Sequence, residues 1–271
     1  MKSLVQHISQ LKTLHSLNEF IQEEFKFRIG GNSAKNRYSP KTNEELKQII
    51  QDHYDAGVYN LNDIDVSKIT DFSKLFFEDE NTDNTEFDVS EWNVSNGENF
   101  SNMFYECKNF NCDLSKWDVS NGEEFISMFY RCNKFNSDLS NWDVSSGINF
   151  AYMFNACKNF NSDLSKWNVS NGKNFKFMFC GCENFNSNLS RWNVSNGKNF
   201  SNMFDGCKEF NCDISRWDVN NGSYFTGMFC NCEKFNADLS NWDVSNGKNF
   251  VIMFRDCPIK QEFKPKHENI Y

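Results

Sequence analysis

Proline and histidine are scarce in this chain, and long apolar runs are missing. Three prolines and four histidines occur among 271 residues. No segment approaches the roughly 18 consecutive apolar residues that mark a bilayer-spanning helix. The N-terminus also lacks the apolar stretch of a secretory signal peptide. We therefore expect no transmembrane segment, and the sequence as it stands predicts a cytoplasmic protein.

Lys and Arg residues are also fewer than Asp and Glu residues. The formal net charge is −9, and the Lys and Arg residues are scattered singly without a basic run. Proteins that bind nucleic acids usually carry a basic face, because contacts with phosphates supply much of their affinity. We therefore expect no nucleic-acid partner. Separately, the sequence predicts no cofactor.

Phenylalanine, by contrast, is abundant, and most of it belongs to a repeat. The chain has 29 Phe residues, and from about residue 58 a similar sequence motif recurs every 25 residues. Two residue types mark this period: Trp92, Trp117, Trp142, Trp167, Trp192, Trp217 and Trp242, and Cys107, Cys132, Cys157, Cys182, Cys207, Cys232 and Cys257. Such a period indicates a solenoid, propeller or array, and it is too short for a propeller blade of roughly 40–45 residues.

Each copy changes its periodicity partway along. Residues 100–107 carry apolar side chains at i, i+3, i+4 and i+7, which predicts a two-turn helix. Residues 114–121 alternate apolar and polar side chains around Trp117, which predicts a short strand. The Leu-x-x-Trp-x-Val pattern resembles the core of a leucine-rich repeat. The predicted fold class is an α/β solenoid, leucine-rich-repeat-like, with 25-residue coils of a strand plus a short helix.

Two further repeated residue types are typical of turns. A glycine precedes each predicted helix and is expected to permit a tight or positive-φ turn. The aspartate of the "DLS" words is expected to cap a turn by accepting a hydrogen bond from a nearby N–H, as in Asx-turns. The glycines are Gly97, Gly122, Gly147, Gly172, Gly197, Gly222 and Gly247, and the aspartates are Asp113, Asp138, Asp163, Asp213 and Asp238, with Asn188 in one copy.

The sequence divides into three parts. Residues 1–57 do not repeat and are predicted to form a helical N-terminal cap, with an apolar helical stripe over residues 4–17. Thr42 and Glu45 have the spacing of a capping box, and Gly57 is the expected stop of the helix that they begin. The repeat solenoid is predicted over 58–257, with a degenerate first coil at 58–90 and regular coils from about 91 to 257, followed by a C-terminal tail or cap at 258–271.

The repeated words "MFxxCxxFNxDLSxWDVSN" closely resemble the BspA-like bacterial surface-protein repeat, a branch of the leucine-rich-repeat proteins often described as a domain of unknown function. The resemblance covers about residues 38–257. It implies a repeat fold, a binding role, and attachment to other proteins at a cell surface. The family defines no catalytic residues, so the resemblance transfers none.

The eleven cysteines are open to three interpretations. Seven form the ladder with a 25-residue period, and four lie elsewhere, at Cys112, Cys180, Cys212 and Cys230. Buried thiols pack as small hydrophobes, and we favour this interpretation over a disulfide or a metal site. Structural zinc usually needs paired Cys or His ligands, and the histidines lie outside the repeats. We therefore expect no metal, and reduced thiols.

Polar side chains between the inward-facing Leu, Trp and Val are the candidate binding residues. If each segment is a strand, these side chains point to one face of the solenoid, which we take as the concave face. The alternative is a solvated face whose Asp and Asn side chains hydrogen-bond along the stack. The candidates are Lys116, Asp118, Asn141, Asp143, Lys166, Asn168, Arg191, Asn193, Arg216, Asp218, Asn241 and Asp243.

The function that these patterns favour is binding without catalysis. We expect a rigid concave face that binds a protein, or a glycan, in an attachment or interaction role. The alternative is a structural scaffold that self-assembles without a specific ligand, and the chain is expected to be a monomer or an end-to-end oligomer. No copy breaks the repeat with a group of catalytic side chains, so no enzyme activity and no catalytic residue are predicted.

Overall fold

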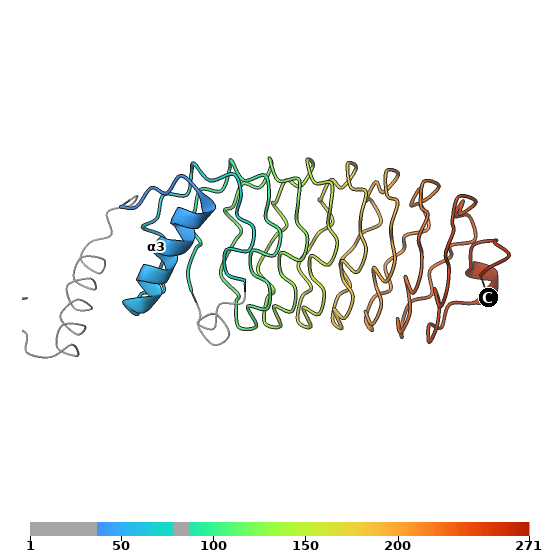
Figure 1. The fold of residues 1–271 in the computed structure, drawn as a ribbon. Helices are drawn as coiled ribbons and strands as arrows, with labels where there is room; N and C mark the ends of the chain where they lie inside the picture. Colours follow the sequence, from blue (N-terminus) through green and yellow to red (C-terminus); the bar gives the residue numbers. More distant parts are fainter. Residues whose placement is uncertain (1–36, 78–86, 271) are drawn as a thin grey trace, which may run out of the picture.

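The structure, a computed structural model, describes residues 37–77 and 87–270. The chain winds into stacked coils along one axis, with a helix at the N-terminal end of the stack and the C-terminus at the other (Figure 1). Two helices are assigned among these residues, α3 (Asn43–Asp55) and the 3-10 helix η1 (Gln261–Phe263). Neither α3 nor η1 is long and apolar enough to cross a membrane. The helical stripe predicted over residues 4–17 lies outside the described residues.

Helix α3 begins and ends where the sequence predicts. The Thr42 Oγ1 accepts a hydrogen bond from the Glu45 N–H at 3.2 Å, which makes Thr42 the N-cap. The Glu45 carboxylate in turn accepts from the Lys41 N–H at 2.7 Å, one residue before the position of a standard capping box. The helix ends before Gly57, which has a φ of 68° and so takes the left-handed conformation common after helices.

The same helix closes the N-terminal end of the stack. Leu46 and Ile50 are buried in the continuous core, as the apolar face of the helix predicts. The Asn43 side-chain amide donates to the carbonyl oxygens of Asp71 and Ser73, at 2.9 and 3.1 Å. These two carbonyls belong to the first coil of the array, so α3 satisfies backbone groups that a preceding coil would otherwise bond.

The predicted short helix at residues 100–107 is absent, and two successive turns replace it. The Met103 N–H donates to the Phe100 carbonyl at 3.2 Å, and the Cys107 N–H donates to the Phe104 carbonyl at 3.1 Å. The third residue of each turn, Asn102 or Glu106, has a positive φ of 57° or 60°. This is the conformation that type II turns require at that position.

The turns leave backbone N–H groups free to join one coil to the next. Phe100, Asn102 and Phe104 donate to carbonyls of the following coil at 2.8, 2.7 and 2.9 Å. A helix would use these N–H groups within its own coil, because each helical N–H bonds the carbonyl four residues back. Single parallel bridges mark the line of stacking at Asp71, Asn99, Glu124, Asn149, Asn174, Asn199, Tyr224 and Asn249.

The segment at residues 114–121 is also built from turns, and no strand is assigned to it or to any other part of the described chain. The Trp117 N–H donates to the Leu114 carbonyl at 3.1 Å, and the Gly122 N–H donates to the Val119 carbonyl at 2.8 Å. Asp and Asn side chains offer local backbone partners that compete with an extended strand. The alternation of buried and exposed side chains that the sequence predicts is nevertheless present.

The core consists of aromatic ladders that run along the stack. Neighbouring rings lie nearly parallel: Trp117 and Trp142 have centroids 6.4 Å apart and an angle of 1° between their planes. The Trp142 indole N–H donates to the carbonyl of Leu114 at 2.9 Å. Because the buried indole N–H needs an acceptor, this bond fixes the distance between consecutive coils as well as the orientation of the ring.

The glycine before each first turn has a different role from the one predicted. None of these glycines has a positive φ. A Cβ on any of them would instead lie 2.1–2.5 Å from the Cζ of the Phe three residues later, for example Phe150 beside Gly147. Glycine is therefore required by the close approach of a core ring to the backbone.

Candidate binding surfaces

The predicted binding residues lie on exposed turns rather than on a strand face. The Asp113 Oδ1 accepts from the Ser115 N–H at 2.9 Å, and the Asp118 Oδ1 accepts from the Ser120 N–H at 3.0 Å. Both are Asx-turns, so the expectation that the "DLS" aspartate caps a turn is confirmed. Asn188 makes the same contact with Ser190 at 3.1 Å. These hydrogen bonds lower the pKa of Asp113.

The structure arranges the predicted residues in two parallel exposed rows, with one member of each row in every coil. Members of the first row directly precede the Trp ladder, and members of the second row directly follow it. All twelve side chains are exposed: Lys116, Asn141, Lys166, Arg191, Arg216 and Asn241 in the first row, and Asp118, Asp143, Asn168, Asn193, Asp218 and Asp243 in the second. The second row is engaged in Asx-turns, so the first row is the freer of the two.

Charge is distributed unevenly along the first row. Lys116 pairs with Glu91 of the preceding coil at 2.5 Å. Three consecutive coils then present Lys166, Arg191 and Arg216, which we call the basic strip. Within the described residues none of these three side chains forms an ion pair with a carboxylate. The strip thus offers exposed positive charge at one-coil intervals on an acidic protein. Asp163 lies close enough to Lys166, and Asp213 close enough to Arg216, for their charges to interact, but neither carboxylate forms an ion pair with the strip.

Half-buried aromatic side chains form a second surface feature, on the double-turn side of the coils. Tyr105 stacks on Tyr130 with centroids 4.6 Å apart, and Tyr152 stacks on Phe177 at 4.8 Å. Lys176 lies over the last two rings, at 5.8 and 5.4 Å from their centroids. Because the rings face one another, their flat faces are largely occupied within the chain and leave mainly edges for a ligand.

The cysteine ladder is buried from Cys107 to Cys232, and Cys257 at its end is partly exposed. The Cys157 Sγ donates to the Phe129 carbonyl at 2.8 Å, and Cys132, Cys182, Cys207 and Cys232 make the same contact with the preceding coil at 2.9–3.0 Å. None of the eleven cysteines, all of which lie within the described residues, forms a disulfide. Burial raises the pKa of the Cys132, Cys157, Cys182 and Cys207 thiols. Each thiol in this ladder acts as a hydrogen-bonded core side chain.

Potential metal ligands stay apart in the part of the chain that the structure describes. No three His, Cys, Asp or Glu side chains there gather closely enough to hold an ion. The pair of His53 and Asp63, 3.1 Å apart, is almost entirely buried beneath α3. The pair joins the cap to the first coil, and its burial is that of a structural contact.

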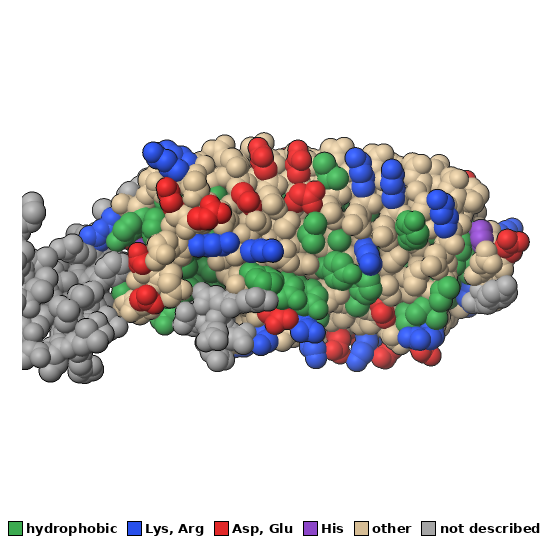
Figure 2. Space-filling view, in the orientation of Figure 1, with side chains coloured by type: hydrophobic (Ala, Val, Ile, Leu, Met, Phe, Trp, Pro, Cys, Tyr) green, Lys and Arg blue, Asp and Glu red, His purple; other side chains and the backbone are tan. Residues whose placement is uncertain are grey.

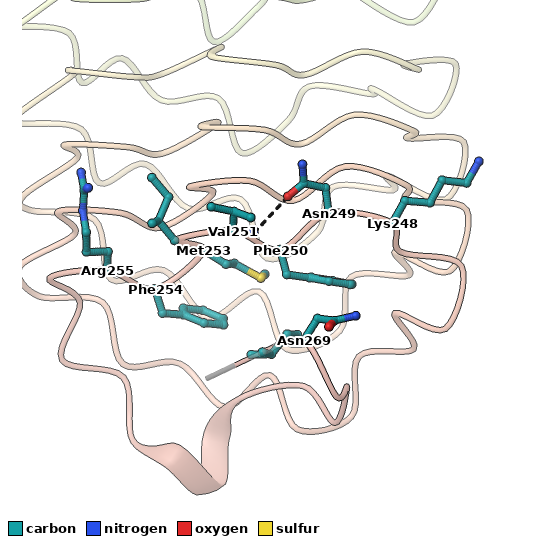
Figure 3. Close-up of a pocket in the computed structure, with 10 residues that line it drawn as sticks. Lys248, Asn249, Phe250, Val251, Met253, Phe254, Arg255 and Asn269 are labelled. Carbon is teal, nitrogen blue, oxygen red and sulfur yellow. Dashed lines mark hydrogen bonds between the residues drawn. The ribbon is translucent and has the colours of Figure 1, made fainter.

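The C-terminal end of the stack is open. A depression of about 660 Å³ lies there, lined by Phe250, Met253, Phe254 and Ile270, with Lys248 and Arg255 at its rim (Figure 3). Val251 and Ile252 beside it are 63% and 41% exposed. No coil follows, so the N–H groups that join coils elsewhere have no acceptor at Phe250, Ile252 or Phe254 among the described residues.

Sequence reasoning identified the exposed rows but missed the double turn. The positive-φ positions include Asn102, Asn202, Gly181, Gly206 and Gly227. Asn and Gly are the residues that most readily adopt this conformation. They occupy six of the fifteen positive-φ positions in the coils, and the others include Tyr152, Phe177 and Ile252, so the signal in the sequence against a helix was only weak.

Comparison with known families gives one match that extends over most of the chain. A family model described as "Mycoplasma protein of unknown function, DUF285" matches residues 44–167, 127–207 and 148–265. The three matched stretches overlap, as expected when one pattern fits several sets of successive coils. No curated protein and no solved structure matches the sequence.

Proposed function

Because this chain belongs to the family described as Mycoplasma protein of unknown function, DUF285, whose description assigns no activity, we propose a function from its surface. The protein is a non-catalytic binding module, and the basic strip of Lys166, Arg191 and Arg216 contacts an acidic surface of a partner protein. The observation that carries this proposal is that these three side chains are exposed on three successive coils and that, among the described residues, none of them is held in an ion pair.

The construction of the coils supports such a role. Neighbouring coils are joined by backbone hydrogen bonds and by stacked rings, so the spacing of the strip is set before any partner arrives. A preformed surface avoids part of the entropy cost of ordering side chains and loops on binding. Complementary charge also accelerates association and favours acidic partners over others.

The competing function, a scaffold assembled end to end, has less support. Such stacking would join the open C-terminal end of one molecule to the N-terminal end of the next. The carbonyls of Asp71 and Ser73 at that N-terminal end already accept hydrogen bonds from Asn43, and α3 lies over them. End-to-end assembly would therefore require α3 to be displaced together with its buried Leu46 and Ile50.

We also propose kinship with the BspA-like surface repeats, and with it an attachment role at a cell surface. The support is that the sequence motif from Met103 to Asn121 recurs in successive coils. A leucine-rich-repeat type of solenoid is part of this proposal. It is supported by the 25-residue period and by the inward-facing Leu, Trp and Val, although each coil is built from turns.

The test is affinity capture from native cell extract and from extracellular matrix with three versions of the chain. The wild type is compared with a strip variant, Lys166→Glu, Arg191→Glu and Arg216→Glu. The matched control, Lys134→Glu, Lys260→Glu and Lys266→Glu, makes the same charge change at three exposed cations outside the basic strip. Circular dichroism and thermal melting establish that all three versions fold.

We expect an acidic protein that the wild type and the control retain and the strip variant loses, with capture weakened by added salt. Capture of the same proteins by wild type and strip variant contradicts the basic strip as the contact. Absence of any captured protein with all three versions favours the scaffold function instead.

A further inference from the structure

A second charged row runs along the stack, separate from the basic strip. From Glu98 onward its members follow the glycine of each coil, and each of these donates its N–H to the carbonyl of the preceding member at 2.8–2.9 Å. In chain order the row is Thr70, Glu98, Glu123, Ile148, Lys173, Lys198, Ser223 and Lys248. We call it the edge row. Because backbone hydrogen bonds join its members directly, their order along the stack is fixed.

The charges of the edge row are segregated by sign. Glu98 and Glu123 lie on neighbouring coils, and Lys173 and Lys198 lie on another neighbouring pair. All four side chains are exposed, and none of them forms an ion pair within the described residues. Figure 2 shows this change of sign along the upper edge of the molecule, where acidic side chains are followed toward the C-terminal end by basic ones; a separate basic cluster lies at the N-terminal end.

This arrangement is unfavourable within one chain. Coils stack at about the 4.7–4.9 Å spacing of hydrogen-bonded strands, and like charges directly opposite each other at that spacing destabilise the pair. Elsewhere the protein pairs opposite charges between coils, as Arg131 does with Glu106 at 2.9 Å and Lys208 does with Glu183 at 2.9 Å. The edge row departs from this pattern over several coils.

The order of the row is self-complementary about Ile148. A two-fold axis through Ile148 would place Glu123 opposite Lys173 of a second copy and Glu98 opposite Lys198. The next positions outward, Thr70 and Ser223, are both small and polar and would also face each other. Interfaces between identical chains related by a two-fold axis use one patch that is complementary to itself.

We propose that the edge row is a self-association surface on which two copies of this chain lie side by side and antiparallel. Each like-charged pair then meets a pair of the opposite sign, and the half-buried Ile148 meets its own counterpart. The C-terminal opening takes no part in this arrangement, so the contact differs from end-to-end stacking. It also leaves the basic strip, in a separate row, available to another partner.

The proposed dimer is weak and sensitive to salt. Exposed ion pairs contribute little individually, and ions in solution screen them. We expect a dissociation constant that rises at least ~10-fold between low salt and ~0.5 M NaCl. Sedimentation equilibrium over a range of concentrations, at both salt levels, measures this change.

The decisive experiment uses two complementary variants. The first, Glu98→Lys with Glu123→Lys, makes the row basic on both sides of Ile148, and the second, Lys173→Glu with Lys198→Glu, makes it acidic on both sides. We expect each variant alone to be monomeric at the concentration where the wild type associates. We expect an equimolar mixture to form a one-to-one dimer, because every pair across the two-fold axis is then of opposite sign.

A third variant distinguishes self-association through the edge row from partner binding through the basic strip. The variant Lys166→Glu with Arg191→Glu changes the charge by the same amount as the second edge variant but lies in the basic strip, so it should associate as the wild type does. A wild type that stays monomeric at low salt up to its solubility limit overturns the inference. So does a mixture of the two edge variants that associates no better than either variant alone.

Discussion

The ring of Phe150 fills the space beside Gly147, where a Cβ would lie 2.3 Å from the ring Cζ. This contact predicts that Gly147→Ala destabilises the protein although alanine is the smallest change possible. The fully buried ring has no room to withdraw, and overpacking of a core typically costs about 1–3 kcal/mol. Urea unfolding followed by tryptophan fluorescence should place this variant at the upper end of that range.

Gly206→Ala is the matched control for that prediction. Gly206 has a φ of +73°, but a Cβ there would meet no atom closer than 3.7 Å. The equivalent residue two coils earlier is Ala156, with a φ of 59°, so alanine already occupies this conformation in the same protein. We expect a loss of only about 1 kcal/mol from the left-handed backbone. Equal losses for the two variants would contradict the steric explanation.

A second prediction concerns a hydrogen bond that one coil lacks. The N–H groups of Leu114, Leu139 and Leu164 donate to serine hydroxyls of the following coil at 2.9–3.0 Å. At the equivalent position after Ile214 the chain has Ala237, and the described residues offer that N–H no acceptor. Ala237→Ser should therefore stabilise the fold by about 0.5–1.5 kcal/mol, measured as an increase in the urea midpoint.

Ser162→Ala provides the opposite change at a coil where the bond exists. It removes the acceptor for the buried Leu139 N–H, and an unsatisfied buried donor costs about 1–3 kcal/mol. An Ala237→Ser variant that is no more stable than the wild type would show that the missing hydroxyl is not the limiting feature of that coil.

A third prediction concerns thiol reactivity. Burial raises the pKa of the ladder thiols, including Cys132 and Cys182, above the ordinary value. It also raises the pKa of the half-buried Cys112 to about 12. Since only the thiolate is nucleophilic, iodoacetamide at about pH 8 should label these residues slowly in the native protein and rapidly in denaturant. Peptide mass spectrometry identifies the labelled positions, and fast native labelling of the ladder would contradict the buried arrangement.

A fourth prediction concerns acid. The turn hydrogen bonds lower the pKa of Asp113, Asp138, Asp163 and Asp213 from the ordinary value of 3.8. The folded state therefore binds these protons less readily than the unfolded state does. Their contribution to stability is present above pH 3.8 and is lost as the pH falls through the lowered folded values. We expect the melting temperature to decline steeply over that window.

Substitution of these aspartates by asparagine tests the cause of the acid effect. Asn188 shows that an asparagine keeps the turn, because its Oδ1 accepts from the Ser190 N–H at 3.1 Å. A variant with Asn at 113, 138, 163 and 213 should retain its fold and lose stability more gradually on acidification. An unchanged pH profile would indicate that other carboxylates control the acid transition.

The aromatic ladders of the core and the bounds of α3 could be predicted from the sequence, because they depend on spacing and on local capping residues. The 25-residue period places Trp117 over Trp142 whatever the local backbone does. The start of α3 at Thr42 and its end before Gly57 follow from local capping chemistry. The exposed position of Lys166 and Arg191 follows from alternation with buried neighbours, which turns and strands share.

The backbone of each coil could not be predicted in this way. Apolar side chains at i, i+3, i+4 and i+7 satisfy a helix and also satisfy two turns with a left-handed residue at Asn102 and Glu106. Hydrogen bonds to the next coil decide between them, and those bonds exist only when many coils are stacked. The edge row was missed for a related reason: its self-complementary order becomes visible only when one residue from each coil is read along the stack.

The backbone bonds between coils also have a consequence for copy number. Each interior coil presents the same donors and acceptors to both neighbours, so an in-frame duplication or deletion of one repeat would leave the remaining junctions intact. The N-terminal helix and the C-terminal tail would be unaffected by such a change. The order of charges in the edge row would be altered, because an added or lost member shifts every later position by one coil relative to the earlier ones. A change in the number of repeats would thus alter the length of the protein and keep its fold, while it would weaken the proposed pairing with copies of the original length.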